Sequence, residues 1–163
     1  MSSTLREHRS ASGRLMWKNG DQRVPLDGAG QFVDSGRWRD VGVTHWHLIP
    51  PREWAVSDSA RFSTENARTE RVRSSAGVAR SPHEVLDWLQ STLDTLISEH
   101  GHDDAMLRSS GILTEEDRRS KAENQFWMAM FGKDVCCMLA LRGGRISHYT
   151  AYAMTERECS VPH

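Results

Sequence analysis

The sequence lacks long apolar runs and has few cysteines. No apolar stretch approaches the ~18 residues that a membrane-spanning helix needs, and the N-terminal residues lack the apolar core of a signal peptide. Only 3 cysteines are present, and Cys136 and Cys137 are adjacent. Because neighbouring side chains on a strand point to opposite faces, Cys136 and Cys137 are not expected to pair with each other. The odd number of cysteines also gives no sign of a disulfide framework. We therefore expect a cytoplasmic protein with reduced thiols and no membrane segment.

The chain also lacks an excess of positive charge. Its formal net charge is -1, which excludes a protein whose whole surface attracts nucleic acid. Arginine is concentrated over 61–80, inside a long polar loop that we expect over 57–81. Nucleic-acid contact through this loop is kept as a second alternative function, without support from the overall charge.

Tryptophan, in contrast, is abundant. Six tryptophans in 163 residues indicate a packed core, because large aromatic side chains dominate cores and interfaces. The length fits one domain. We expect a flexible N-terminal lead-in over 1–13, a single domain over 14–154 and a C-terminal tail over 155–163.

Two helices have clear start and stop signals. A serine cap, a proline at the first helical position and a glutamate three residues after the cap predict a helix over 82–100. A threonine cap with an acidic first turn predicts a second helix over 115–131. Each range is followed directly by a glycine, the residue that most often closes a helix.

The segment 134–154 predicts a β-hairpin. Gly143 and Gly144 can form a two-residue turn, since both of its positions require positive φ. With that turn Leu139 lies opposite His148, and neither face of the hairpin is clearly polar. We therefore expect both strands to be covered on both faces.

Two further strand regions are expected. The run 40–49 is rich in β-branched and aromatic residues, and Pro50-Pro51 is expected to end it. A first hairpin is expected to join 14–18 to 22–26 through a turn at Asn19-Gly20. The resulting fold class is α+β, with an antiparallel sheet that contains 40–49 and the hairpin and packs against the two helices.

His45 and His47 are the most suggestive candidate ligands. Residues two apart on a strand present both imidazoles to one side, roughly 6.5 Å apart at Cα, and imidazole is a common metal ligand. Glu53 or His148 is expected to complete the set around one divalent transition metal. His45-x-His47 with the later Glu53 resembles the His-x-His and Glu of cupin metal sites over nine residues. The interval to Glu53 is longer than in that family, and no second cupin motif is found.

The other histidine cluster has a simpler interpretation. His100 and His102 lie where the first helix should end, and a histidine there complements the helix dipole. The aspartates that follow can cap the next turn. No Gly-x-Ser-x-Gly elbow and no phosphate-binding P-loop are present. The sequence therefore contains no complete catalytic motif.

The first functional expectation is a non-catalytic binding or accessory protein. It would recognise a protein partner or a small ligand through an aromatic and apolar surface near the sheet. The candidate binding residues are Trp46, Trp54, His148 and Tyr149. A homo-oligomer, a homodimer in particular, is also considered. The alternative is a metal-dependent enzyme that uses the His45-x-His47 site.

Overall fold

The computed structural model describes residues 6–9, 15–18, 24–57, 72–161 and 163. The chain divides into two compact units, Met1–Val33 and Asp34–His163. In the first unit β1 (Arg6–Arg9) pairs antiparallel with β2 (Leu15–Lys18). The expected lead-in thus contains a strand, which pairs with β2. Residues 22 and 23 of the expected partner strand 22–26 lie outside the described residues. The turn expected at Asn19-Gly20 lies outside the described residues.

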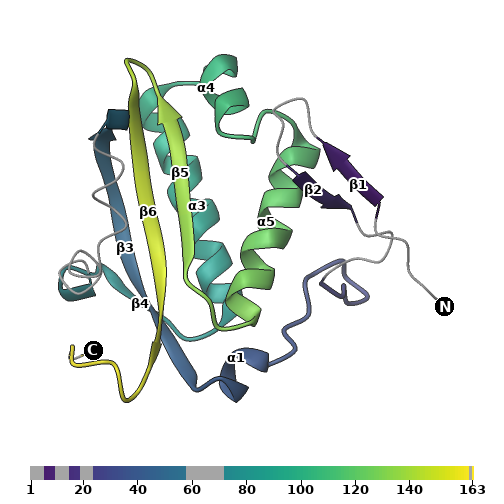
Figure 1. Ribbon diagram of the computed structural model, residues 1–163, viewed down its shortest axis with the longest axis vertical. Coiled ribbons are helices and arrows are strands. Elements are labelled where there is room, and N and C mark those ends of the chain that lie inside the picture. Colours follow the sequence, from purple (N-terminus) through teal and green to yellow (C-terminus); the bar gives the residue numbers. More distant parts are fainter. Residues whose placement is uncertain (1–5, 10–14, 19–23, 58–71, 162) are drawn as a thin grey trace. The chain divides into compact units, whose positions relative to one another are not determined.

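The second unit is built on a four-stranded antiparallel sheet with the strand order β4-β3-β6-β5 (Figure 1). Its strands are β3 (Val43–Ala55), β4 (Gly77–Ala79), β5 (Val135–Leu141) and β6 (Arg145–Thr155). The predicted α+β class is confirmed, with the expected strand and hairpin in one sheet. β4 is an addition, because its residues lie in the stretch that was predicted to be a loop.

The helices of this unit are α1 (Arg37–Asp40), α3 (Pro82–His100), α4 (Asp104–Ser109) and α5 (Glu115–Met130). The long helices α3 and α5 cover one face of the sheet (Figure 1). Both start signals are confirmed. The Glu84 N–H donates to Ser81 Oγ at 3.2 Å, and Thr114 and Asp117 form a reciprocal capping box. No helix in the described part of the chain is long and apolar enough to cross a membrane.

β3 continues through Pro50 and Pro51, so the prediction that these prolines end the strand is wrong. The pairing with β6 has a register shift between Ile49 and Arg52. On its other edge β3 pairs with β4 only from Trp46 to Leu48. The prolines therefore lie in a bulge where no ladder N–H is required of them, the place where a strand tolerates proline.

The hairpin register differs by one residue from the prediction. Arg142 joins the two glycines in a three-residue loop, and Leu139 lies opposite Ser147, not His148. A shift of one residue turns every side chain to the opposite face. As a result Tyr149 faces the helices, where its ring packs edge-on against Trp88 with centroids 6.0 Å apart.

The main core lies between the sheet and the helices. Its most buried members include Trp46, Leu89, Leu107, Leu139 and Tyr149. The opposite side of the sheet, called the second face below, carries a smaller cluster that consists of Ile49, Val72, Tyr152 and Met154. Cys136 and Met138 of β5 are exposed there. The expectation that both hairpin strands are covered on both faces is therefore wrong for β5.

Candidate metal centre

His45 and His47 lie side by side on the second face, near one end of β3. The residue between them, Trp46, points into the main core, so strand alternation turns both imidazoles the other way. Both are buried, with 3% and 0% exposure. Their Nε2 atoms are 3.2 Å apart. The pairing of these two residues on one face, which the sequence predicts, is present in the structure.

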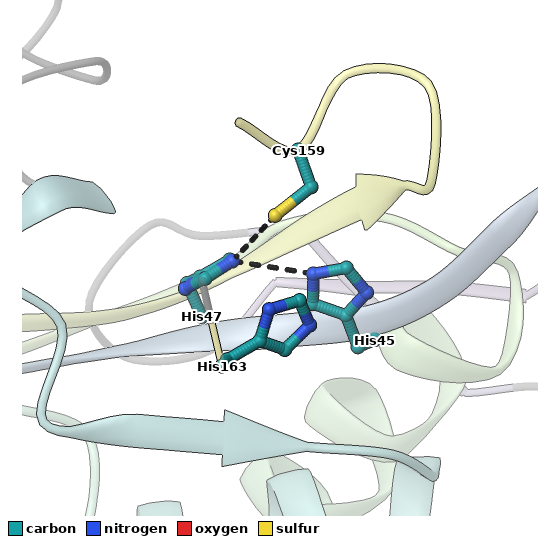
Figure 2. Close-up of side chains that lie close together, drawn as sticks. All are labelled: His45, His47, Cys159 and His163. Carbon is teal, nitrogen blue, oxygen red and sulfur yellow. Dashed lines mark hydrogen bonds between the residues drawn. The ribbon is translucent and has the colours of Figure 1, made fainter. Parts of the chain in front are cut away.

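The chain after β6 turns back over this face. Thr155 Oγ1 accepts a hydrogen bond from the Glu158 N–H, and Glu158 Oε2 accepts one from the Thr155 N–H. The Cys159 N–H donates to the Thr155 carbonyl at 3.1 Å. Cys159 and Val161 pack against the smaller cluster. This turn brings Cys159 Sγ to 3.2 Å from His47 Nε2 (Figure 2).

His163 completes a group of four side chains. Its ring centroid lies 4.3 Å from that of His45 and 5.3 Å from that of His47. One ligand atom from each of His45, His47, Cys159 and His163 can be chosen so that all four lie within 4.8 Å of one another. Figure 2 shows the three imidazoles and the thiol converging from β3 and from the segment after β6.

Each of the three histidines has a polar partner at Nδ1. These partners are Thr44 Oγ1 at 2.8 Å for His45, Ser75 Oγ at 3.1 Å for His47 and Val161 O at 3.0 Å for His163. The carbonyl oxygen can only accept, so a neutral His163 carries its proton at Nδ1 and keeps a lone pair at Nε2. Hydroxyl oxygens that accept in the same way leave the other two Nε2 lone pairs free. Such outer partners orient the histidine ligands of metal sites.

The electrostatics of the group favour neutral imidazoles. Burial, helped by His163, His47 and Arg80, lowers the pKa of His45 to about 4. Burial and His163 also lower the pKa of His47. Both imidazoles are therefore neutral near pH 7, which is the form that binds a metal ion. Two neutral Nε2 lone pairs 3.2 Å apart repel each other unless a proton or a cation lies between them.

The separations fit a tetrahedral transition-metal site. Metal bonds of about 2.0 Å to nitrogen and about 2.3 Å to sulfur place two nitrogens about 3.3 Å apart and nitrogen and sulfur about 3.5 Å apart. The corresponding distances here are 3.2 Å and 3.2 Å, and all four ligand atoms lie within 4.8 Å of one another. A bound ion therefore requires the two close pairs to move slightly apart and the widest pair to move closer. Three imidazoles and one thiolate suit Zn²⁺ and its neighbours, whereas Mg²⁺ and Ca²⁺ prefer oxygen.

The structure does not bring Glu53 to this group. The register shift at the two prolines turns Glu53 to the helix side, opposite Ser147. Its carboxylate there contacts Arg145 at 3.2 Å and His100 at 3.3 Å. The likeness to a cupin site, which depends on Glu53, therefore has no counterpart in the structure.

His148 is also distant from the group, although it lies on the same face. It pairs with Arg52, while His47 pairs with Tyr152. Four residues along a strand correspond to about 13 Å, so His148 cannot share one ion with His45 and His47.

The residues that were expected to bind a partner are divided between the two sides of the sheet. Trp46 and Tyr149 are 0% and 1% exposed in the main core, so neither can touch a partner. Trp54 and His148 are half-buried on the second face. The Arg52 guanidinium lies over the Trp54 ring, 5.0 Å from its centroid.

The predicted ligand set does not include Cys159 and His163, because the sequence predicts a C-terminal tail over 155–163. Two signals were available. Thr155 and Glu158 have the Thr-x-x-Glu spacing of a reciprocal cap, which predicts a turn directly after the strand. Cys159 and His163 have a Cys-x3-His spacing, within the range that zinc ligands use.

The fold and the site define an α+β protein with a candidate three-histidine, one-cysteine metal centre between its sheet and the segment after β6. Comparison of the chain with protein-family models, curated proteins and solved structures gives no match.

Proposed function

We propose that the protein binds one transition-metal ion, with Zn²⁺ as the first candidate, through His45, His47, Cys159 and His163. The observation that carries the proposal is the convergence of three imidazoles and one thiol within 4.8 Å. The Nδ1 contacts support it, because they leave the Nε2 atoms available as ligands. None of the three cysteines forms a disulfide, which is consistent with a thiolate ligand and with the reducing cytoplasm as the setting.

The ligands come from two places in the chain, and this suggests what the ion does. Two belong to β3, and two belong to the segment that follows β6. An ion held by all four connects that segment to the sheet. Four protein ligands are typical of structural zinc sites, whereas catalytic sites keep one position open. We therefore propose a stabilising role in which metal binding fixes this segment over the second face.

Metal stoichiometry tests the proposal. Untagged protein is stripped of metal, incubated with Zn²⁺ and measured by elemental analysis after removal of the excess. We expect one zinc per chain in the wild type and a loss of nearly all of it in His45→Ala/His47→Ala.

The chain offers a matched control in its other His-x-His pair. His100 contacts Glu53, and His102 contacts Asp104 at 3.7 Å. The variant His100→Ala/His102→Ala also removes two imidazoles, but these lie outside the proposed centre. It should therefore keep one zinc per chain. Folded wild-type protein that binds no zinc, or equal zinc loss in both double variants, would contradict the proposed site.

A second candidate function is recognition of a partner at the exposed part of the second face. The observation that favours it is the 49% exposure of Met138, which lies opposite His148 in the hairpin. The simplest partner is a second copy of the chain. Sedimentation of the wild type over a concentration series should then show a mass increase that is absent in Met138→Lys. A monomeric mass at every concentration would rule out self-association through this face.

A further inference from the structure

The four proposed ligands differ in how firmly the protein holds them. His45 and His47 are buried, Cys159 is half-buried and His163 is exposed. The Nδ1 atoms of the two buried histidines are hydrogen-bonded to Thr44, which belongs to β3, and to Ser75, which lies shortly before β4. The corresponding bond of His163 goes to Val161 and stays within the same segment. His163 is therefore the ligand that can leave with the least disturbance of the fold.

An arginine lies near His45, one of the two buried ligands. Ala79, the last residue of β4, pairs with Trp46, and the next residue of the chain is Arg80. Its side chain is exposed. Its charge contributes, after burial and the two histidines, to the lowered pKa of His45.

The backbone of Arg80 is fixed at the start of α3. Its N–H donates to Glu84 Oε2 at 2.7 Å, and Glu84 belongs to the Ser81 cap. The root of the side chain is thus anchored next to the metal ligands while its guanidinium remains in solvent. This arrangement suits a group that contacts a ligand arriving from solution.

We propose that His163 is a displaceable ligand and that an oxyanion, a carboxylate or a phosphate, can take its place on the metal with Arg80 as a second contact. The inference rests on the proposed metal binding. The exchange breaks one bond from the metal to Nε2 and forms one bond from the metal to oxygen. It involves no change of oxidation state and no proton transfer when the anion is already ionised.

The charge balance supports an anion in this position. A divalent ion, one thiolate and neutral imidazoles have a net charge of about +1, and Arg80 adds a further positive charge. The planar guanidinium matches carboxylate and phosphate oxygens in two-point contacts. When the anion is bound, three protein ligands and one exchangeable position remain, the arrangement of catalytic zinc sites.

Cobalt substitution tests the inference through a readout other than activity. Co²⁺-loaded wild type and His163→Ala are titrated with acetate and, separately, with inorganic phosphate, and the visible absorption of the cobalt is followed. We expect His163→Ala to keep one cobalt per chain and to bind at least one of the anions about tenfold more tightly than the wild type, because the competing ligand is gone. The anion with the larger effect identifies the class of ligand.

Arg80 is tested in the same background. Arg80→Ala added to His163→Ala should weaken anion binding by about threefold, the effect of an exposed charge pair. The matched control is Arg108→Ala, which removes an exposed arginine from α4 and should change nothing. Equal effects of the two arginine substitutions would overturn the assignment of Arg80.

The failures of the two proposals are distinguishable. Wild type that takes up no cobalt would overturn the metal site and the inference together. Wild type that takes up cobalt, combined with a His163→Ala variant that loses the ion, would overturn the inference alone, because His163 is then an essential ligand. The same holds if the cobalt spectrum of His163→Ala responds to neither anion.

Discussion

The three cysteines lie in three different environments, and this predicts their reactivity. Cys136 is exposed. Cys137 is buried, accepts a hydrogen bond from Gln125 Nε2, and has a pKa that burial raises to about 11. Cys159 lies half-buried in the proposed centre. Because only a thiolate reacts with iodoacetamide, we expect the metal-free native protein at pH 8 to be modified at Cys136 and Cys159 but not at Cys137.

Zinc should change only one of these reactivities. A bound ion is coordinated by the Cys159 sulfur, so alkylation of Cys159 should stop while alkylation of Cys136 continues. Peptide mass spectrometry after timed labelling measures each site separately, and unfolded protein gives the full reactivity of all three thiols. Labelling of Cys159 at the same rate with and without zinc would mean that this thiol is not a ligand.

Gly132 follows α5 at a crowded position. Its φ is +72°, and an added Cβ would lie 2.7 Å from Val41 Cγ2 and 3.0 Å from Val43 Cγ2. Gly111 has nearly the same φ, +71°, with nothing within 4 Å of such a Cβ. Both substitutions to alanine cost about 1 kcal/mol for the left-handed backbone. Only Gly132→Ala adds a steric clash, which costs about 1–3 kcal/mol more.

Urea unfolding followed by tryptophan fluorescence measures this difference. We expect Gly132→Ala to lose clearly more free energy of unfolding than Gly111→Ala. Equal losses of free energy in the two variants would mean that the residues around Gly132 move aside for the added methyl group without destabilising the fold.

At the scale of elements, the start of α5 is fixed by its own first turn. Thr114 Oγ1 accepts a hydrogen bond from the Asp117 N–H at 3.0 Å, and Asp117 Oδ2 accepts one from the Thr114 N–H at 3.1 Å. We expect Thr114→Ala to lower the free energy of unfolding by about 1 kcal/mol. Thr114→Ser keeps the hydroxyl and should stay near the wild type in the same urea titration. If serine and alanine are equally destabilising, the hydroxyl is not the stabilising group.

Local signals explain which elements the sequence predicts well. The caps of α3 and α5 involve residues three apart, so the start of each helix can be predicted without tertiary information. Whether β3 can continue through Pro50 and Pro51 depends on how the neighbouring strands pair with it there. A local sequence pattern does not carry this information. The predicted length of the hairpin loop is wrong for a related reason, because the two glycines fit both a two-residue and a three-residue loop.

The candidate site divides in the same way. His45 and His47 are two apart on one strand, so their shared face follows from strand geometry alone. Cys159 lies 112 residues from His47 in sequence, and only the folded sheet and the returning segment bring the two together. Glu53 and His148 were assigned on the assumption of an unbroken strand and a different register, and both assumptions failed at specific residues, the two prolines and Arg142.

At the scale of the whole molecule, the proposed metal ion is what holds the segment after β6 in place over the sheet. This segment contacts the smaller cluster through Cys159 and Val161, a limited apolar area, whereas α3 and α5 pack on the main core. We expect removal of metal with a chelator to speed amide hydrogen exchange over 156–161 and to leave α3 and α5 unchanged. Exchange that rises uniformly, or nowhere, would contradict a role confined to this segment.

One metal ion held by three imidazole nitrogens and one thiolate is the feature on which the proposed function depends. X-ray absorption spectroscopy of the zinc-loaded protein measures that set of ligands directly. We expect one sulfur at about 2.3 Å and three nitrogens at about 2.0 Å from zinc, with the sulfur lost in Cys159→Ser. A zinc environment without sulfur in the wild type, or one unaffected by Cys159→Ser, would contradict this ligand set.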